Sequence, residues 1–390
     1  MTPSRVAAWR WSGSTTCRPS LMHVVVGLSG GVDSAVTALL LREAGHEVSG
    51  VFMVNWTADE SGYCNAAEDF ASARAVAEEL DIPLQRVDFS RTYHEQVFQE
   101  FLAQYARGRT PNPDILCNRA IKFAPFLAHA RRLGADAVAT GHYARLQQDA
   151  GGPRLLRAID DNKDQSYFLA GVARSAFDGV QFPLGELSKT DVRAKARAAG
   201  LPNHQRKDST GICFIGERHM RDFLAQWLPA QPGPIVDSRG RELGRHQGVA
   251  FYTQGQRRGL AVGGVAGAAE APWYVIERDV TGNRLVVDQD PEHPRLMART
   301  IELIDTHWIR RPPEIDGGDR SLALEVRIRH RQSLQAAALE VGADGRSSLH
   351  FEQPQRAAAP GQYAVFYQGE ECLGCAEIDR VHALEGTVAS

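Results

Sequence analysis

A glycine-rich stretch near the start of the chain is the first candidate site. Residues 27–34 read GLSGGVDS, between the apolar run HVVV and the helical pattern AVTALLLREAG. Glycines where a strand meets a helix let backbone N–H groups approach an anion, and the helix dipole favours negative charge there. The Walker phosphate-binding pattern places a lysine near the end of such a loop, whereas Asp33 and Ser34 stand at that point here. The spacing therefore predicts a phosphate site that differs from an ordinary γ-phosphate site.

Two cysteines stand in polar, loop-like surroundings. Cys117 ends the stretch TPNPDILC, which contains Asp114, and Cys213 lies in KDSTGICFIG. A single cysteine is usually a small buried hydrophobe. A reactive thiolate instead needs polar or positive surroundings and solvent access. Both cysteines are therefore candidates for catalysis.

The elements that must position these residues follow a regular rhythm. From residue 23 to about 144, short apolar runs alternate with helical patterns, which predicts a doubly wound α/β domain with a parallel sheet. Ligands of such sheets bind beyond the carboxyl ends of the strands, where GLSGGVDS, FMVNW and ATGHY all fall. Further helices are predicted at SKTDVRAKARAAG, with Ser188 and Asp191 as a capping box and Gly200 as a stop, and at ERHMRDFLAQWLP.

The pattern changes after about residue 230 to short strands separated by glycine-containing turns. From residue 298 the runs ARTIELIDTHWI, LALEVRIRHRQSLQAAALEV, SSLHFEQPQRAAA and QYAVFYQGEECLGCAEI also read as strands. Cys372 and Cys375 in the last run have zinc-knuckle spacing but no second Cys/His pair, so we expect a structural role for them. The expected order is a disordered extension (1–21), an α/β domain (22–228), a central β-rich domain (229–296) and a C-terminal β-barrel-like domain (297–385).

Composition sets wider limits. The chain has 390 residues, 43% of them hydrophobic, and a formal net charge of −3. Since no apolar run of about 18 residues occurs, a membrane span is not expected. The net charge gives no general support for a nucleic-acid partner, so local basic clusters such as 256–258 and 327–331 would have to hold one. Six scattered cysteines are typical of a reducing compartment.

The first twenty residues are rich in Arg, Ser and Thr and contain no acidic residue. This pattern occurs in mitochondrial targeting segments. A disordered tail, or a start site at Met22 directly before the first strand, is the favoured interpretation.

Eight motifs give the chain a specific resemblance. GLSGGVDSAV, VFMVNW, TPNPDILCNRAIKF, ATGHYAR, DQSYFL, STGICFIG, GQRRGL and PGQYAVFY occur in the order and approximate spacing of the MnmA family of bacterial tRNA-specific 2-thiouridylases. That family belongs to the PP-loop ATP pyrophosphatase superfamily, and the resemblance runs from about residue 22 to 380. It implies an adenine nucleotide α-hydrolase-like PP-loop domain followed by two small β-rich domains. It also implies ATP with Mg²⁺, adenylation of O2 of the wobble uridine with release of pyrophosphate, and replacement of that oxygen by persulfide sulfur with release of AMP.

The resemblance further implies roles for individual residues. Cys213 would carry sulfur as a persulfide, Cys117 would be the partner nucleophile and Asp114 a candidate general acid or base. ATP would be bound by Gly27, Leu28, Ser29, Gly30, Gly31, Val32, Asp33, Ser34, Met53 and Gly141, with Asp33 helping to hold Mg²⁺. The target base would be met by Asn112, Pro113 and Asp114, and the rest of the tRNA by His142, Lys163, Asp164, Gln165, Arg329, His330 and Gln362. Where the family often has an Arg-Tyr pair, this chain has Arg329 and His330.

The implied chemistry is coherent on its own terms. A uridine C2 carbonyl is a poor electrophile, and adenylation of its oxygen makes AMP the leaving group for a soft sulfur nucleophile. Of two separate thiols, one accepts and delivers the sulfur, and the other resolves the persulfide by forming a disulfide. Because Cys117 and Cys213 are far apart in the sequence, they meet only if loops close over the substrate.

The implied partners are tRNAs for glutamate, glutamine and lysine, together with a sulfur-relay protein or a cysteine desulfurase, in the cytoplasm and without a membrane. Two alternatives stay open at this point. One is an ammonia-dependent PP-loop ligase, which needs an ammonia source and no pair of loop cysteines. The other is a non-catalytic adenine-nucleotide sensor, which binds ATP without releasing pyrophosphate.

Overall fold

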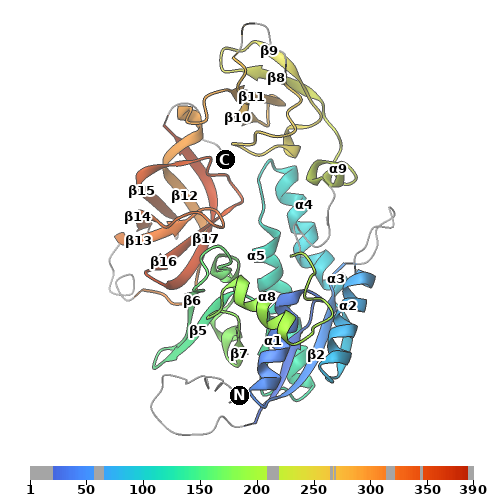
Figure 1. The fold of residues 1–390 in the computed structure, drawn as a ribbon. Coiled ribbons are helices and arrows are strands. Elements are labelled where there is room, and N and C mark those ends of the chain that lie inside the picture. Colours follow the sequence, from blue (N-terminus) through green and yellow to red (C-terminus); the bar gives the residue numbers. More distant parts are fainter. Residues whose placement is uncertain are drawn as a thin grey trace, which may run out of the picture.

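The computed structural model describes residues 21–56, 66–208, 219–263, 267, 269–312, 321–342 and 346–384. Figure 1 shows three parts along the chain: an α/β part (blue to green), a small β-rich part (yellow) and a β barrel (orange to red). Among the described helices, none is both long and apolar enough to cross a membrane.

The α/β part is built on a five-stranded parallel sheet with the strand order β3-β2-β1-β4-β7. The strands are β1 His23–Gly27, β2 Glu47–Val54, β3 Leu84–Asp88, β4 Ala137–Ala139 and β7 Val180–Gln181. Successive residues of a strand point to opposite faces of its sheet. In β1, Val24 and Val26 belong to one buried cluster and Val25 belongs to another. The sheet is therefore buried on both faces, which confirms the predicted doubly wound α/β class.

Helices cover both faces of this sheet. α1 Val32–Glu43, α2 Ala66–Glu79 and α8 Lys189–Ala198 contribute to the cluster that contains Val24 and Val26. The cluster that contains Val25 takes residues from α3 Ser90–Tyr93, α4 Gln99–Ala106, α5 Pro113–Cys117 and α6 Pro125–Arg132. Two π-helical turns, η1 His94–Phe98 and η2 Asn118–Lys122, interrupt this second group.

The capping box predicted for α8 is confirmed, since Ser188 accepts a bond from the Asp191 amide and Asp191 accepts one from the Ser188 amide. The helix predicted in ERHMRDFLAQWLP is shorter than its pattern, and α9 spans only Met220–Leu224. Short helical turns complete this part: α7 Ser166–Leu169 and η3 Arg174–Phe177.

The central part is a four-stranded sheet with the order β10-β11-β8-β9. Its strands are β8 Gly233–Asp237, β9 Glu242–His246, β10 Tyr274–Asp279 and β11 Arg284–Asp288, and the turn η4 Val249–Phe251 follows β9. β8 and β11 are parallel, and the other pairs are antiparallel.

The C-terminal part is a closed barrel. After the turn η5 Pro294–Leu296 come β12 Met297–Trp308, β13 Ser321–Arg327, β14 Gln335–Val341, β15 Ser347–Arg356, β16 Tyr363–Gln368 and β17 Glu371–Ala383. β12 pairs with both β15 and β17, which closes the barrel. The run LALEVRIRHRQSLQAAALEV, predicted as one strand segment, forms the separate strands β13 and β14.

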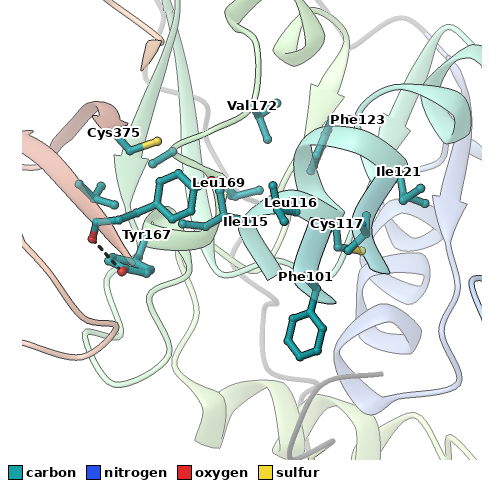
Figure 2. Close-up of a cluster of buried hydrophobic side chains, with 14 of the residues drawn as sticks. Phe101, Ile115, Leu116, Cys117, Ile121, Phe123, Tyr167, Leu169, Val172 and Cys375 are labelled. Carbon is teal, nitrogen blue, oxygen red and sulfur yellow. Dashed lines mark hydrogen bonds between the residues drawn. The ribbon is translucent and has the colours of Figure 1, made fainter. Parts of the chain in front are cut away.

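A hairpin joins the first part to the barrel. β5 Ala144–Asp149 and β6 Gly152–Arg157 lie within the α/β segment of the sequence, yet β6 pairs with β17 through Leu155 and Leu156. Apolar packing continues across this junction, and the Tyr167 hydroxyl donates a hydrogen bond to the Tyr363 carbonyl at 3.0 Å (Figure 2). The α/β part and the barrel therefore share a sheet and a core, while the domain limits given above remain a proposal.

Candidate functional site

The glycine-rich loop lies where the order of the sheet reverses. The chain runs from β1 outward to β2 and β3 on one side, and β4 pairs with β1 on the other side. GLSGGVDS leaves the carboxyl end of β1 and begins α1, while ATGHY leaves the end of β4. This crevice between neighbouring strands is where open α/β sheets bind their ligands.

Hydrogen bonds fix the shape of the loop. Ser34 Oγ donates to the Gly31 carbonyl at 3.0 Å and accepts from the Ser29 amide at 3.1 Å. Gly30 has φ +82°, in the left-handed region that favours glycine, and a Cβ there would lie 2.3 Å from the Asp69 carbonyl oxygen. The loop is thus held in one conformation by its own side chains and by its neighbours.

A hollow of about 420 Å³ lies beside the loop. Three of its lining side chains, Ser72, Asn203 and Arg206, donate hydrogen bonds to the Gly30 carbonyl at 2.8, 2.9 and 3.3 Å. These three donors satisfy the Gly30 carbonyl oxygen and fix the orientation of its peptide group in the loop.

The start of α1 has the geometry of an anion site. Its N-cap residue is Gly31, and no side chain caps it. The first-turn amides of a helix have no acceptor inside the helix, so they can bind a ligand. A Cβ at Gly141 would lie 2.8 Å from the Ser34 nitrogen, so glycine at this position keeps that amide uncovered.

The other predicted nucleotide residues gather at the same place. A Cβ at Gly27 would lie 3.3 Å from Cε of Met53, which stands near the carboxyl end of β2. Leu28 and Val32 are buried in the core, so they would serve a ligand through their backbone only. The structure thus brings together the whole predicted set, from Gly27 to Ser34 with Met53 and Gly141, although their binding of ATP stays a prediction.

Two hydrogen-bond donors converge on Asp33 beside the loop, and the sequence did not predict either of them as a site residue. Asp33 Oδ1 accepts hydrogen bonds from the Tyr143 hydroxyl at 2.8 Å and from Lys189 Nζ at 2.7 Å. Tyr143 is part of the quoted motif ATGHY, which was a usable signal. Lys189 is the first residue of α8, far from the loop in the sequence, and only the fold reveals it.

Asp208 pairs with three basic side chains beside the loop. Its carboxylate pairs with Lys163 at 2.6 Å, Lys189 at 2.8 Å and Arg193 at 2.6 Å. Burial alone would raise its pKa, but the hydrogen bonds from Lys163 and Lys189 more than offset this and lower the pKa to about 2. Asp208 is therefore a carboxylate at neutral pH. It directly precedes residues 209–218, which lie outside the described part and contain Cys213.

The residues present fit Mg²⁺ only as an ion shared with phosphate. The described part of the chain holds no group of three or more His, Cys, Asp or Glu side chains able to bind a metal. Mg²⁺ in nucleotide sites is commonly held by one or two carboxylates together with the phosphates. Asp33, which is 32% exposed and stands in the first turn of α1, is the carboxylate placed to do this.

Cys117 ends α5, on the face of the sheet covered by the second group of helices. Asn112 caps this helix by accepting a bond from the Ile115 amide at 3.4 Å, and Pro113 occupies its first turn. The polar, loop-like surroundings expected for Cys117 are wrong, because it ends a helix and its side chain is buried in the apolar cluster that also contains Leu116 and Phe123 (Figure 2). A π-helical turn follows Cys117 immediately, a distortion that is frequent at functional sites.

Asp114 lies on the exposed side of the same helix. Its surroundings nevertheless desolvate the carboxylate and raise its pKa, and the nearby Lys122 ammonium opposes this rise. A raised pKa brings a carboxyl group closer to the pH at which it can exchange a proton, so the geometry is compatible with the predicted general acid or base. The relation of Cys117 and Asp114 to Cys213 falls outside the described residues.

Two predicted tRNA residues line a cavity of about 350 Å³ where all three parts of the chain meet. Its walls include Thr110 of the α/β part, Gln256 of the central part, and Arg329 and Gln362 of the barrel. Gln362 Nε2 donates to the Thr110 carbonyl at 2.7 Å, so it also supports the loop that leads to Asn112. Arg329 and Gln362 are thus placed to contact a ligand that spans the three parts.

Two other predicted tRNA residues are buried, and for them the predicted contact is not supported. His142 is packed against Phe123 and Phe182, and burial lowers its pKa well below the ordinary value. Its Nε2 lies 3.2 Å from the Lys122 ammonium and its Nδ1 lies 2.7 Å from Thr140 Oγ1. An ammonium only donates, so Nε2 accepts and Nδ1–H donates to Thr140. His142 thus holds Lys122 in place next to Asp114.

Asp164 is the second of these. It accepts bonds from the amides of Ala158 and Ser166 and pairs with the buried guanidinium of Arg327 at 2.6 Å. The ring of Tyr367 lies under the same guanidinium. Arg327 was expected to contact phosphate as part of the basic cluster 327–331. This prediction is wrong, because its guanidinium is buried and paired with Asp164.

The remaining predicted tRNA residues are more accessible. Lys163 and Gln165 are half-buried, Lys163 in its pair with Asp208, and Gln165 accepting from the Tyr143 amide at 2.9 Å. His330 Nε2 lies 3.0 Å from the Asp164 carbonyl, and burial lowers its pKa. Their contact with tRNA stays a prediction.

Cys372 and Cys375 are buried in β17, within the barrel. Burial raises the pKa of both thiols, in the case of Cys375 to about 12. A thiol with a raised pKa is a poor nucleophile at neutral pH. This agrees with the structural role expected for the pair.

Three family models match the chain. One described as a tRNA methyl transferase HUP domain matches residues 22–217, one described as a tRNA methyl transferase PRC-barrel domain matches 221–289, and one described as an aminomethyltransferase beta-barrel domain matches 298–378.

Proteins with curated names match nearly the whole chain. A tRNA-specific 2-thiouridylase MnmA from Halorhodospira halophila is 52% identical over 364 residues, which is 92% of this chain and 94% of that protein. The protein of the same name from Sodalis glossinidius is 51% identical over 353 residues, 90% of this chain and 95% of that one. Among solved structures, a U34-tRNA thiolase NcsA from Methanococcus maripaludis covers 49% of this chain and 61% of its own, with 19% identity and a TM-score of 0.34, too low to carry an argument.

Proposed function

The chain belongs to the MnmA family of tRNA-specific 2-thiouridylases, and we propose that it is an ATP-dependent sulfurtransferase that makes 2-thiouridine at the wobble position of tRNA. The observation that carries this proposal is the start of α1. There, uncapped amides at the switch point of a parallel sheet form a phosphate site in a chain of this family.

ATP supplies the activation. The first turn of α1 holds its phosphates, while Gly27, Met53 and Gly141 border the same crevice. The O2 atom of uridine attacks the α-phosphate, pyrophosphate leaves, and the base carries AMP. Mg²⁺, held by Asp33 and the phosphates, would neutralise charge on the phosphates when it is bound. A loop that expels pyrophosphate has no need of a Walker lysine within its own sequence.

Cys117 and Cys213 then exchange oxygen for sulfur. Cys213 carries a persulfide, whose outer sulfur attacks C2 of the adenylated base. Cys117 attacks the inner sulfur of Cys213 to form a disulfide, which frees the outer sulfur to stay on the base as AMP leaves. We assign the movement of the proton of the base to Asp114, three residues before Cys117, and its raised pKa supports this role.

The family-model descriptions refer to methyl transferase domains, whereas the relatives are called 2-thiouridylases. Relatives that share half of all residues over nine-tenths of the chain weigh more than the description of a domain model. The chemistry agrees with them, because the glycine-rich loop serves the activation by ATP, and the two cysteines of the family motifs, Cys117 and Cys213, serve sulfur transfer.

We propose tRNA as the macromolecular substrate, with glutamate, glutamine and lysine isoacceptors implied by the resemblance. The anticodon loop must release a stacked uridine, and proteins that act on such bases splay them out of the stack. The cavity with Arg329 and Gln362, at the junction of the three parts, is large enough for one nucleoside of that loop and supports a contact with it. A sulfur-relay protein or a cysteine desulfurase in the cytoplasm would supply the persulfide.

The ammonia-dependent PP-loop ligase is the less favoured alternative. It would need ammonia in place of a persulfide, and the named relatives point away from it.

A reconstituted reaction tests the proposal. Purified protein, ATP, unmodified glutamate tRNA and a low-molecular-weight persulfide are incubated, and the digested tRNA is examined for 2-thiouridine by mass spectrometry. The wild type and Cys375→Ser, a control outside the site, should both form the product, while Cys213→Ser should form none. Normal product from Cys213→Ser would refute the persulfide route, and an amidated product would favour the ligase.

A further inference from the structure

The loop GLSGGVDS has no lysine of its own, and the structure supplies one from another helix. When the loop is set against the Walker pattern, Asp33 stands where the lysine would be. The Lys189 ammonium lies 2.7 Å from the Asp33 carboxylate. A positive charge is therefore present next to that position, although it comes from α8.

The placement of Lys189 is costly for the protein. Its side chain is only 13% exposed, and it is the first residue of α8, where the helix dipole disfavours a cation. Buried ion pairs seldom add stability over apolar packing, because desolvation consumes the attraction. Stability therefore does not explain a lysine at this position, and binding of a ligand does.

The Lys189 ammonium has one donor hydrogen that its two carboxylate partners do not use. An ammonium has three donor hydrogens, and two of them serve Asp33 and Asp208, at 2.7 and 2.8 Å. Asp33 is 32% exposed, so solvent reaches the pair.

Lys189 can turn toward a phosphate, because Asp33 and Asp208 each keep another donor when it leaves them. Asp208 would keep Lys163 and Arg193, both at 2.6 Å. Asp33 would keep the Tyr143 hydroxyl at 2.8 Å. No carboxylate is then left buried without a donor, which is the usual penalty for breaking such a pair.

We propose that Lys189 is the phosphate-binding cation of this site: its ammonium contacts the β- and γ-phosphates of ATP and the departing pyrophosphate, from α8 instead of from the loop. This inference rests on the proposed function, since it assumes that the loop binds ATP. It assigns Lys189 to the leaving part of the nucleotide and not to the adenosine or the α-phosphate.

Equilibrium binding of three probes tests the assignment. ATP, inorganic pyrophosphate and AMP are titrated calorimetrically, in the presence of magnesium, into the full-length wild type, Lys189→Met and Lys189→Arg. Lys195→Met, a matched loss of charge near the other end of α8, is the control. Loss of a charge-assisted hydrogen bond predicts that Lys189→Met binds ATP and pyrophosphate about tenfold to a hundredfold more weakly. AMP, which lacks both outer phosphates, should bind that variant within twofold of the wild type.

A purely structural lysine would give a different pattern, because ATP and AMP would then lose affinity equally. That result, or an unchanged ratio of ATP to AMP affinity in both Lys189 variants, overturns the proposal. Lys189→Arg keeps the charge and should retain part of the preference, so it remains informative if the methionine variant is unstable. A wild type that binds none of the probes would instead refute the nucleotide site itself, which separates the two failures.

Discussion

At the residue scale, the site depends on groups whose charge is set by their neighbours. Asp208 stays ionised because lysine hydrogen bonds outweigh its burial, and its pKa is about 2. His142 stays neutral because burial and the Lys122 charge oppose its protonation. Neutral His142 then accepts a hydrogen bond from Lys122, whose charge opposes the rise in the pKa of Asp114. Substitution of His142 would remove the hydrogen bond that positions Lys122, and so would alter the pKa of Asp114.

The neutral state of His142 predicts a pH dependence of stability. At pH 5.5 an unfolded histidine, with a pKa near 6.5, binds a proton that the folded His142 does not, so the unfolded state gains stability as pH falls. The contribution of His142 is complete above pH 6.5 and declines below it. Each unit of pKa depression is worth about 1.4 kcal/mol. We expect the melting temperature to fall between pH 7.5 and 5.5, and to fall less in His142→Gln.

Calorimetric melting of the two proteins at both pH values checks this. His246 and His330 also have lowered pKa values and contribute equally to both proteins, so the difference between them isolates His142. An equal fall in the two proteins would mean that His142 is protonated in the folded state.

The sequence predicted which residues gather at the site, but it did not predict which of them are buried. The loop from Gly27 to Ser34 and the partner glycine Gly141 were predicted and are brought together. Asp164 and His142 were expected to contact tRNA because of the family resemblance, and a motif match does not reveal the aromatic rings or the guanidinium that enclose a side chain. Lys189 was missed because its partner Asp33 is 156 positions away, and no local pattern joins them.

At the element scale, the sequence predicted the features that depend on neighbouring residues along the chain. The alternation of apolar runs and helical patterns predicted the parallel sheet, and Ser188 with Asp191 predicted the start of α8. The addition of β5 and β6 to the barrel was not predictable, since strand partners are chosen by tertiary contacts and not by the hairpin's own residues. The same holds for the two π-helical turns, which leave no mark in the apolar periodicity.

The approach of the β4 end to the α1 start makes a prediction at this scale. In Gly141→Ala the new methyl group would lie 2.8 Å from the Ser34 nitrogen, so it would cover that amide or displace the loop. We expect at least about a tenfold loss of ATP affinity, the cost of one hydrogen bond to a charged group. Equilibrium titration with ATP measures it.

Gly244→Ala in β9 is the matched control, because a methyl group there meets nothing within 4 Å. Its affinity for ATP should equal that of the wild type. Unchanged affinity in a folded Gly141→Ala protein would show that the Ser34 amide takes no part in binding.

At the scale of the whole molecule, three parts meet around one cavity. Thr110, Gln256 and Arg329 come from the three parts and line it together. Behind it, Arg109 pairs with Glu377 at 2.8 Å and Asp379 at 2.9 Å, which ties the loop before α5 to the barrel. The segment from Arg109 to Asn112, which leads to α5 and Cys117, is therefore held to the barrel by Arg109 and by Gln362. In the proposed reaction, tRNA reaches this junction while ATP occupies the crevice between β1 and β4.

The products of ATP cleavage show whether the loop expels pyrophosphate in response to tRNA. The full-length protein is mixed with ATP labelled at the α- and γ-phosphates, with and without unmodified substrate tRNA, and the labelled products are separated after a single turnover. We expect AMP and pyrophosphate, formed only when tRNA is present, because the loop expels the β- and γ-phosphates together. ADP and inorganic phosphate, or cleavage that is indifferent to tRNA, would contradict it.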